Sequence, residues 1–220
     1  MENKGDGNFL RRNGLTLVLL ALLLGSLLGQ VIAGRNVYNQ ELAESGVPSL
    51  DWNEYLHSGH FISATFENWE SEFLQMGMYV LLTVSLRQKG SAESRPMKES
   101  QEKERIEQGV KPWPLRAGGA WKALYAHSLA IAFAILFVFS FLLHLDGSWQ
   151  HEQDERIMKG EPPIALAEYI SESQFWFESF QNWQSEFMAV ASLVLLTIWL
   201  RQKDSPQSKS LEAPHSQTGT

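Results

Sequence analysis

The chain has no cysteine, fewer basic than acidic residues and none of the short motifs that mark common enzyme classes. Without cysteine, disulfides, thiolate catalysis and cysteine-ligated metal sites are excluded. A net charge of -7 argues against a general nucleic-acid binder, which needs a basic surface to neutralise phosphate. We therefore expect no nucleic acid among its partners.

Catalytic motifs are also missing. The sequence contains no phosphate-binding loop, no H-E-x-x-H, no G-x-S-x-G and no dinucleotide-binding fingerprint. We expect a protein that is not an enzyme and holds no cofactor, with a membrane enzyme as a minor alternative.

Two long apolar runs stand out in an otherwise charged chain. The run at 15–33, LTLVLLALLLGSLLGQVIA, carries no charge, and the run at 123–145 is similar. Each approaches or exceeds the ~20 residues that a transmembrane helix requires. Both are predicted to span a membrane. A cleaved signal peptide ending at Ala33 is an alternative for the first.

Two further runs are shorter, at 73–86 and 187–200. Each has 14 residues, which cover only roughly 21 Å as a helix against a membrane core of about 30 Å. They are either buried helices of a soluble domain or spans whose helix continues upstream through NWESEF and NWQSEF. We favour the second interpretation.

An offset of 114 residues maps the first half of the chain onto the second without a gap. Between positions 54 and 91, 18 of 38 residues are identical to their counterparts. The first apolar run aligns with the third, which is internal and cannot be a signal peptide. The first is therefore predicted to be a retained helix.

The predicted fold is an all-α membrane protein of four transmembrane helices, arranged as two parallel tandem repeats of two spans. The predicted boundaries are repeat 1 at 9–91 with spans about 15–33 and 68–87, a charged cytoplasmic linker at 92–121, repeat 2 at 122–205 with spans about 123–145 and 182–201, and a disordered cytoplasmic tail at 206–220.

The basic residues are distributed unevenly between the two predicted sides of the membrane. Fifteen Lys and Arg lie in the two terminal segments and the central linker, and three lie in the other two loops. By the positive-inside rule, both termini and the linker are predicted to be cytoplasmic. The expected location is a bacterial inner membrane, with the lipid bilayer as the main partner and a homo-oligomer or a second membrane protein as further partners.

The two outer loops carry aromatic residues at helical spacing. A short helix capped by Ser49 is predicted in the first loop, and another over 165–170 in the second. Amphipathic helices on the outer interface and a small cap packed on itself are both compatible with this pattern.

The motif F-x-N-W-x-S-E-F occurs twice, and its carboxylates head the two short spans. Glu72 and Glu186, with Asn68 and Asn182, are the candidate ion or proton site, because a carboxylate at the membrane boundary is costly unless it is paired, hydrated or protonated. A purely structural role at the helix ends is the alternative.

Histidines give weaker signals. His57 and His60 are three residues apart beside acidic residues, which makes them weak candidates for a metal site, although Gly59 interrupts the helix that would align them. His127 and His144 in the third run are interpreted as hydrogen-bonded packing residues, with a role as proton relays as the alternative. No other metal site is expected.

Three segments carry a resemblance to a known family. FLRRNGLTLVLLALLLGSLLGQ, SGHFISATFENWESEFLQMGMYVLLTV and LRQKGSAESRP resemble a bacterial family of multi-pass membrane proteins, domain of unknown function 6766. The likeness extends from Phe9 to about Asp204. It implies a bacterial membrane protein and supplies no activity or site residue.

Two functions therefore compete. The first is a structural or interaction protein of the membrane. The second is a small oligomeric cation or proton channel or transporter that uses the repeated Glu pair beneath an acidic outer surface.

Overall fold

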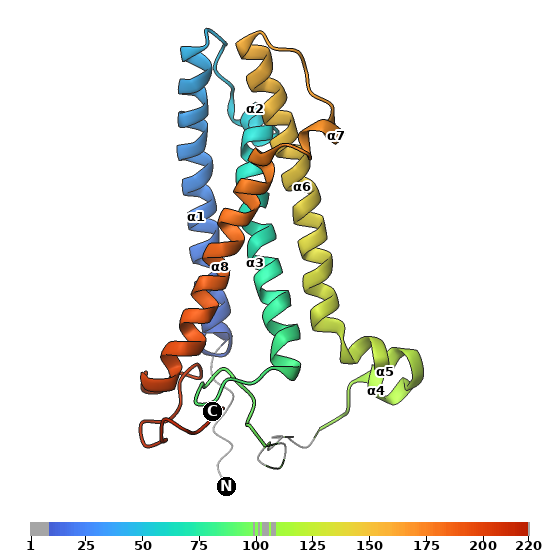
Figure 1. The fold of residues 1–220 in the computed structure, drawn as a ribbon, viewed down its shortest axis with the longest axis vertical. Coiled ribbons are helices and arrows are strands. Elements are labelled where there is room, and N and C mark those ends of the chain that lie inside the picture. The colour runs from blue at the N-terminus through green and yellow to red at the C-terminus, as the bar shows by residue number, and fades with distance from the viewer. Residues whose placement is uncertain (1–8, 99, 101, 103–105, 107–108, 220) are drawn as a thin grey trace. The chain divides into compact units, whose positions relative to one another are not determined.

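The computed structural model describes residues 9–98, 100, 102, 106 and 109–219, and in this part of the chain every regular element is an α-helix (Figure 1). The helices are α1 (Phe9–Glu44), α2 (Trp52–Leu56), α3 (Gly59–Ser85), α4 (Trp113–Ala117), α5 (Gly119–Ala126), α6 (Ser128–Lys159), α7 (Leu166–Tyr169) and α8 (Ser173–Trp199). The all-α class is therefore confirmed for the described residues.

Two helices are long and apolar enough to cross a membrane by length and composition, α1 and α6. Helix α1 contains the first apolar run and α6 contains most of the third, and both continue well past these runs. The third run is not one helix, because α5 ends at Ala126 and α6 begins at Ser128. The boundaries of the predicted span at 123–145 stay a prediction.

The two shorter apolar runs do continue upstream as helix. Both α3 and α8 include the repeated motif and contain 27 residues, about 40 Å of helix. That they cross a membrane, and that the chain consists of tandem repeats, stay predictions.

The short helix α2 lies close to its predicted position but has a different cap. Asp51, not Ser49, occupies the N-cap. Its Oδ1 accepts a hydrogen bond from the Glu54 backbone N–H at 2.8 Å, and Glu54 Oε2 accepts one from the Asp51 N–H at 2.7 Å. This reciprocal capping box satisfies two backbone donors, which a serine two residues earlier cannot do. In the second loop, α7 lies within the predicted 165–170.

The chain divides into two compact units. The first comprises the described residues up to Ala64 together with Asp146–Ala165, and the second comprises Thr65–Leu145 and the chain from Leu166 onward. Helices α3 and α6 each contribute one end to the first unit and the rest to the second. The units thus draw on both predicted repeats.

The core of the first unit is aromatic. Tyr38, Leu42 and Tyr55 are buried, and Phe61 and Met158 pack against them with Leu50. Tyr38 donates a hydrogen bond to Asp154 at 3.3 Å, which joins α1 to the end of α6. These contacts fix the ends of three helices without involving the apolar part of α1.

Two glycines allow α3 and α6 to approach closely in this unit. A Cβ at Gly59 would lie 2.4 Å from the His151 backbone nitrogen and 2.6 Å from the Gly147 oxygen. A Cβ at Gly147 would lie 2.6 Å from the Ser63 nitrogen. Since the obstructing atoms are backbone, no side-chain rotation relieves the clash.

Gly147→Ala should therefore destabilise the protein by about 1–3 kcal/mol, the usual cost of overpacking. The matched control is Gly14→Ala in α1, where nothing lies within 4 Å of the added Cβ. Thermal unfolding in detergent measures both. Equal melting temperatures for the two variants would contradict the close helix contact.

His60 stacks on Tyr38 with ring centroids 4.7 Å apart, and its centroid is 5.2 Å from that of His151. Burial, and then the charge of His151, lower the pKa of His60 from its ordinary value of 6.5 to about 4. The unfolded chain thus binds a proton at this residue before the folded protein does. The associated stability is fully present above pH 6.5 and is lost as the pH falls to about 4.

His60→Gln should accordingly flatten the fall in melting temperature between pH 6.5 and 4, because the unfolded variant has no proton to gain at this position. His57→Gln is the control, since His57 is exposed. If the dependence of melting temperature on pH is unchanged in His60→Gln but altered in His57→Gln, the lowered pKa does not belong to His60.

Candidate functional site

The two copies of the repeated motif meet in the second unit, one on α3 and one on α8. The indole of Trp183 donates a hydrogen bond to Glu70 Oε1 at 3.0 Å, and the Asn182 amide donates one to Glu67. Further along α3, Gln75 donates to the Glu186 carbonyl at 3.2 Å. Asn and Trp occur in both copies of the motif, whereas the carboxylates that they bind, Glu67 and Glu70, occur only in the first copy.

Glu70 also binds α6. Its Oε2 lies 3.0 Å from His144 Nδ1, and both side chains are fully buried, with 0% exposure. A carboxylate beside an imidazole nitrogen is an acceptor, so Nδ1 carries the hydrogen. One carboxylate therefore connects α3, α6 and α8.

The other ring nitrogen of His144 has no such partner. Nε2 is buried and makes no hydrogen bond with any residue that the structure describes. The same is true of Ser140 Oγ, one helical turn earlier on α6. Phe175 packs against the imidazole ring, with centroids 5.0 Å apart. Unpaired buried polar atoms are costly and are often found where a ligand binds.

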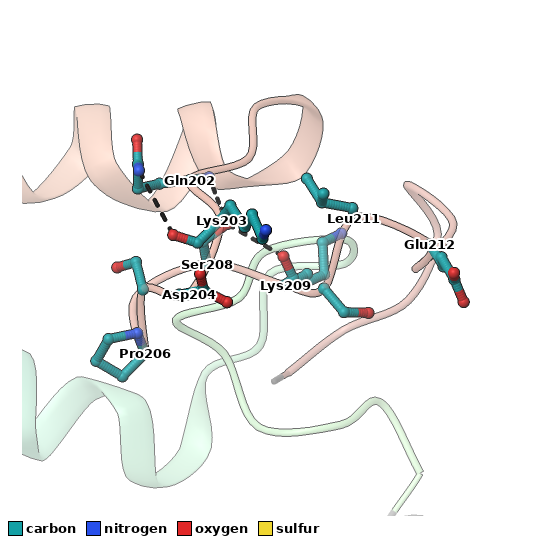
Figure 2. Close-up of a pocket in the computed structure, with 10 residues that line it drawn as sticks. Gln202, Lys203, Asp204, Pro206, Ser208, Lys209, Leu211 and Glu212 are labelled. Atoms are coloured by element: carbon teal, nitrogen blue, oxygen red, sulfur yellow. Dashed lines mark hydrogen bonds between the residues drawn. The ribbon is translucent and has the colours of Figure 1, made fainter.

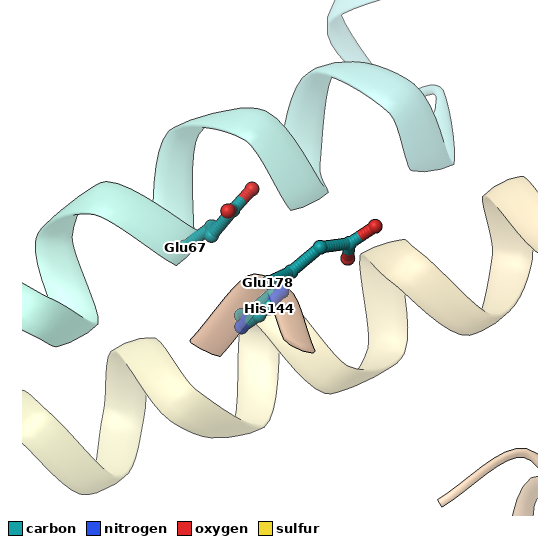
Figure 3. Close-up of side chains that lie close together, drawn as sticks. All are labelled: Glu67, His144 and Glu178. Carbon is teal, nitrogen blue, oxygen red and sulfur yellow. The ribbon is translucent and has the colours of Figure 1, made fainter. Parts of the chain in front are cut away.

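Two further carboxylates complete the cluster. Glu67, His144 and Glu178 each offer one ligand atom, and these three atoms lie within 4.8 Å of one another. The side chains come from α3, α6 and α8, as Figure 3 shows. Among the described residues, no Lys or Arg forms an ion pair with Glu67, Glu70 or Glu178. The carboxylates of this cluster thus have only His144 as a basic neighbour.

The predicted site residues take different positions. Glu72 is exposed, Glu186 is half-buried, and Asn68 is exposed, whereas Asn182 belongs to the cluster through Glu67. On α3 the buried stripe contains Glu70, Ser71 and Gln75. Glu72 is two residues from Glu70 and so points to the other side of the helix.

Sequence reasoning from the repeat missed the central residues because it looked for what the halves share. Glu67, Glu70, His144 and Glu178 all lie where the halves differ. At an offset of 114, their counterparts are Gln181, Gln184, Gln30 and Ala64. For Glu67 and Glu70, the signal that could have found them is the replacement of Gln by Glu inside a well-matched motif. His144 and Glu178 lie outside the motif and carry no such signal.

A family model described as Domain of unknown function (DUF6766) matches residues 6–220. The chain belongs to this family. The resemblance seen in the sequence is thereby confirmed. Comparison with curated proteins and with solved structures gave no significant match. The function of this DUF6766 protein must therefore be argued from its site.

The two weak metal candidates, His57 and His60, each contact a different neighbouring residue and do not form a common site. His57 is exposed, with Nδ1 2.8 Å from the Asn53 carbonyl oxygen. His60 Nδ1 lies 3.3 Å from the Tyr55 hydroxyl. The helix is interrupted here, because α2 ends at Leu56 and α3 begins at Gly59, as the sequence predicted. Neither histidine belongs to the three-residue ligand group that the described residues form.

A hollow in the tail is lined by residues 202–212, all from one segment (Figure 2). Its buried member, Lys209, donates hydrogen bonds to the carbonyls of Gln217 at 2.9 Å and His215 at 3.2 Å, and also to Gly90. The ammonium group is thus satisfied by backbone oxygens. We therefore place the candidate site of this DUF6766 protein at the carboxylate–histidine cluster.

Removing the charge of Glu70 should destabilise the fold, because Glu70→Gln alters two hydrogen bonds of a fully buried side chain. We expect a loss of about 1–3 kcal/mol in the free energy of unfolding. Glu72→Gln, on the exposed side of the same helix, should stay within about 0.5 kcal/mol of the wild type. The two free energies are measured by thermal unfolding in the presence of a chelator. A larger loss in Glu72→Gln would contradict this assignment of faces.

Proposed function

We propose that this DUF6766 protein is an integral membrane protein that binds a cation, either a proton or a metal ion, at its buried carboxylate–histidine cluster. The observation that carries the proposal is the fully buried Glu70–His144 pair, whose histidine forms a three-residue ligand group with Glu67 and Glu178. The proposed role is binding or transfer of a cation and not catalysis.

The membrane assignment is supported by the exposure of the apolar helices. The most apolar 18-residue window is 0% buried in α1 and 11% buried in α6. The core helix of a soluble protein would be mostly buried, and exposed apolar surface of this extent in water favours aggregation. A lipid bilayer is the solvent that suits such helices.

The distribution of charge supports an orientation. Fifteen of the 18 basic residues lie in the termini and the central linker, which we propose to be cytoplasmic in a bacterial inner membrane. The cluster then lies at the outer ends of the predicted spans, since Glu67 precedes the second, His144 ends the third and Asn182 begins the fourth.

Electrostatics favours a cation at this position. A carboxylate removed from water and without a basic partner is strongly destabilised unless it takes up a proton or a cation. Glu67 and Glu178 are half-buried and Glu70 is fully buried. The cluster is a better candidate than the repeated pair Glu72 and Glu186, because Glu72 is exposed.

A structural or interaction role is the second candidate, and one observation favours it. A Cβ added at Gly25 or Gly29 on α1 would have no atom within 4 Å, and the surrounding apolar face is exposed. Small residues four apart allow close packing of membrane helices, which suits a homo-oligomer or a membrane-protein partner. This role requires α1 and not the carboxylates.

Two measurements test the proposal. The protein should stay in the membrane fraction after alkaline carbonate washing, as integral proteins do. The purified protein should also show a melting temperature that responds to protons or metal ions, because a ligand at a hundred times its Kd adds about 2.7 kcal/mol of stability.

Glu178→Gln should reduce this response, and Glu72→Gln should not. Release of the protein by carbonate would contradict the membrane assignment. If the melting temperature responds to cations equally in the wild type and in Glu178→Gln, the cation site is contradicted. The structural or interaction role of α1 is then the remaining candidate.

A further inference from the structure

We propose that Glu67, His144 and Glu178 bind a divalent first-row transition metal ion. This inference rests on the proposed function and names its cation. The three ligand atoms come from three helices, α3, α6 and α8, and lie within 4.8 Å of one another. Zinc bonds to nitrogen and oxygen are about 2.0–2.2 Å long, so two donors on one ion are at most about 4.4 Å apart. Small rotations of the flexible glutamate side chains close this difference.

The histidine is already oriented for coordination. Glu70 Oε2 accepts the hydrogen of Nδ1 at 3.0 Å, which leaves the Nε2 lone pair free. Nε2 is fully buried and has no partner among the residues that the structure describes. A carboxylate behind a metal-binding histidine is the usual arrangement in metalloproteins, because it fixes the tautomer and raises the basicity of the ligand. Glu70 is therefore the positioning residue of this site.

The donor set selects the class of metal. One imidazole nitrogen and two carboxylates suit Zn²⁺, Mn²⁺ or Fe²⁺. Mg²⁺ and Ca²⁺ prefer oxygen ligands alone, and Cu⁺ prefers sulfur, whereas the chain has no cysteine. Three protein ligands leave at least one coordination position open for exchange.

The predicted repeat provides an internal comparison. The counterparts of Glu67 and Glu70 are Gln181 and Gln184, the counterpart of His144 is Gln30, and that of Glu178 is Ala64. None of the matching positions of the other half thus carries a titratable side chain, and three of the four carry an amide. A network needed only for packing would be served by amides in both halves. The titratable residues gathered in one place are those that metal coordination requires.

The test uses the full-length protein in detergent, stripped with a chelator and titrated with Zn²⁺, Mn²⁺, Co²⁺, Mg²⁺ and Ca²⁺ by calorimetry. We expect one equivalent of Zn²⁺ or Mn²⁺ per chain, bound at least tenfold more tightly than Mg²⁺ or Ca²⁺. Co²⁺ should give visible absorption bands typical of nitrogen and oxygen ligation. These bands report the site itself and not the general stability of the fold.

The variants separate ligands from bystanders. Glu178→Gln and Glu67→Gln should weaken binding at least tenfold, and Glu70→Gln should weaken it about 10–100-fold through His144. Glu72→Gln, which changes an exposed carboxylate on α3, should bind as the wild type does. Because Glu178 is only half-buried, its variant should fold, which the melting curve in chelator verifies.

The outcomes are distinct. Binding of Zn²⁺ that is equally tight in Glu178→Gln would place the ion elsewhere, for example on exposed histidines, and would overturn the inference. Absence of metal binding together with a proton-dependent melting temperature that Glu178→Gln removes would also overturn it, while the proposed function would stand as proton binding. Absence of both would overturn both proposals.

Discussion

The contact between Glu70 and His144 is the interaction on which the second unit depends. Both side chains are fully buried, and the same carboxylate also accepts the indole hydrogen of Trp183. One side chain thereby links α3, α6 and α8. Removing a partner from such a buried pair leaves a group without its hydrogen bonds, which costs far more than the pair gains over an apolar replacement. The pair therefore specifies how these three helices meet more than it stabilises them.

The same contact explains the chemistry we propose. Because Nδ1 is engaged by Glu70, Nε2 is the ring nitrogen left to bind a ligand. One ring nitrogen of His144 lies within 4.8 Å of a carboxylate oxygen of Glu67 and of Glu178. No described basic residue neutralises these carboxylates by an ion pair. We propose that protons or a metal ion balance their charge, since the three helices hold one ligand atom of each residue within 4.8 Å of the others. The first unit, with its aromatic core, contributes no comparable group of ligands among the described residues.

The all-α class of the described residues was predictable from the sequence, because apolar runs and helical periodicity are local signals. The continuation of α3 and α8 through the repeated motif is an example. The face of α3 that is buried was not predictable, since Glu72 and Glu70 look equivalent in sequence and only packing distinguishes them. His144 was interpreted as a packing residue because its partner Glu70 is 74 positions away, and such a pair becomes visible only in three dimensions.

The hydrogen bond between His144 Nδ1 and Glu70 is the central physical claim, and it can be measured directly. We would record two-dimensional ¹⁵N–¹H spectra of the protein labelled on histidine side chains, in chelator, and assign His144 with the His144→Gln variant. We predict that Nδ1 carries a hydrogen, donated to Glu70, and that this signature is lost in Glu70→Gln. A ring whose hydrogen lies on Nε2 and not on Nδ1 would contradict the Glu70–His144 hydrogen bond, and with it the orientation of Nε2 toward a ligand.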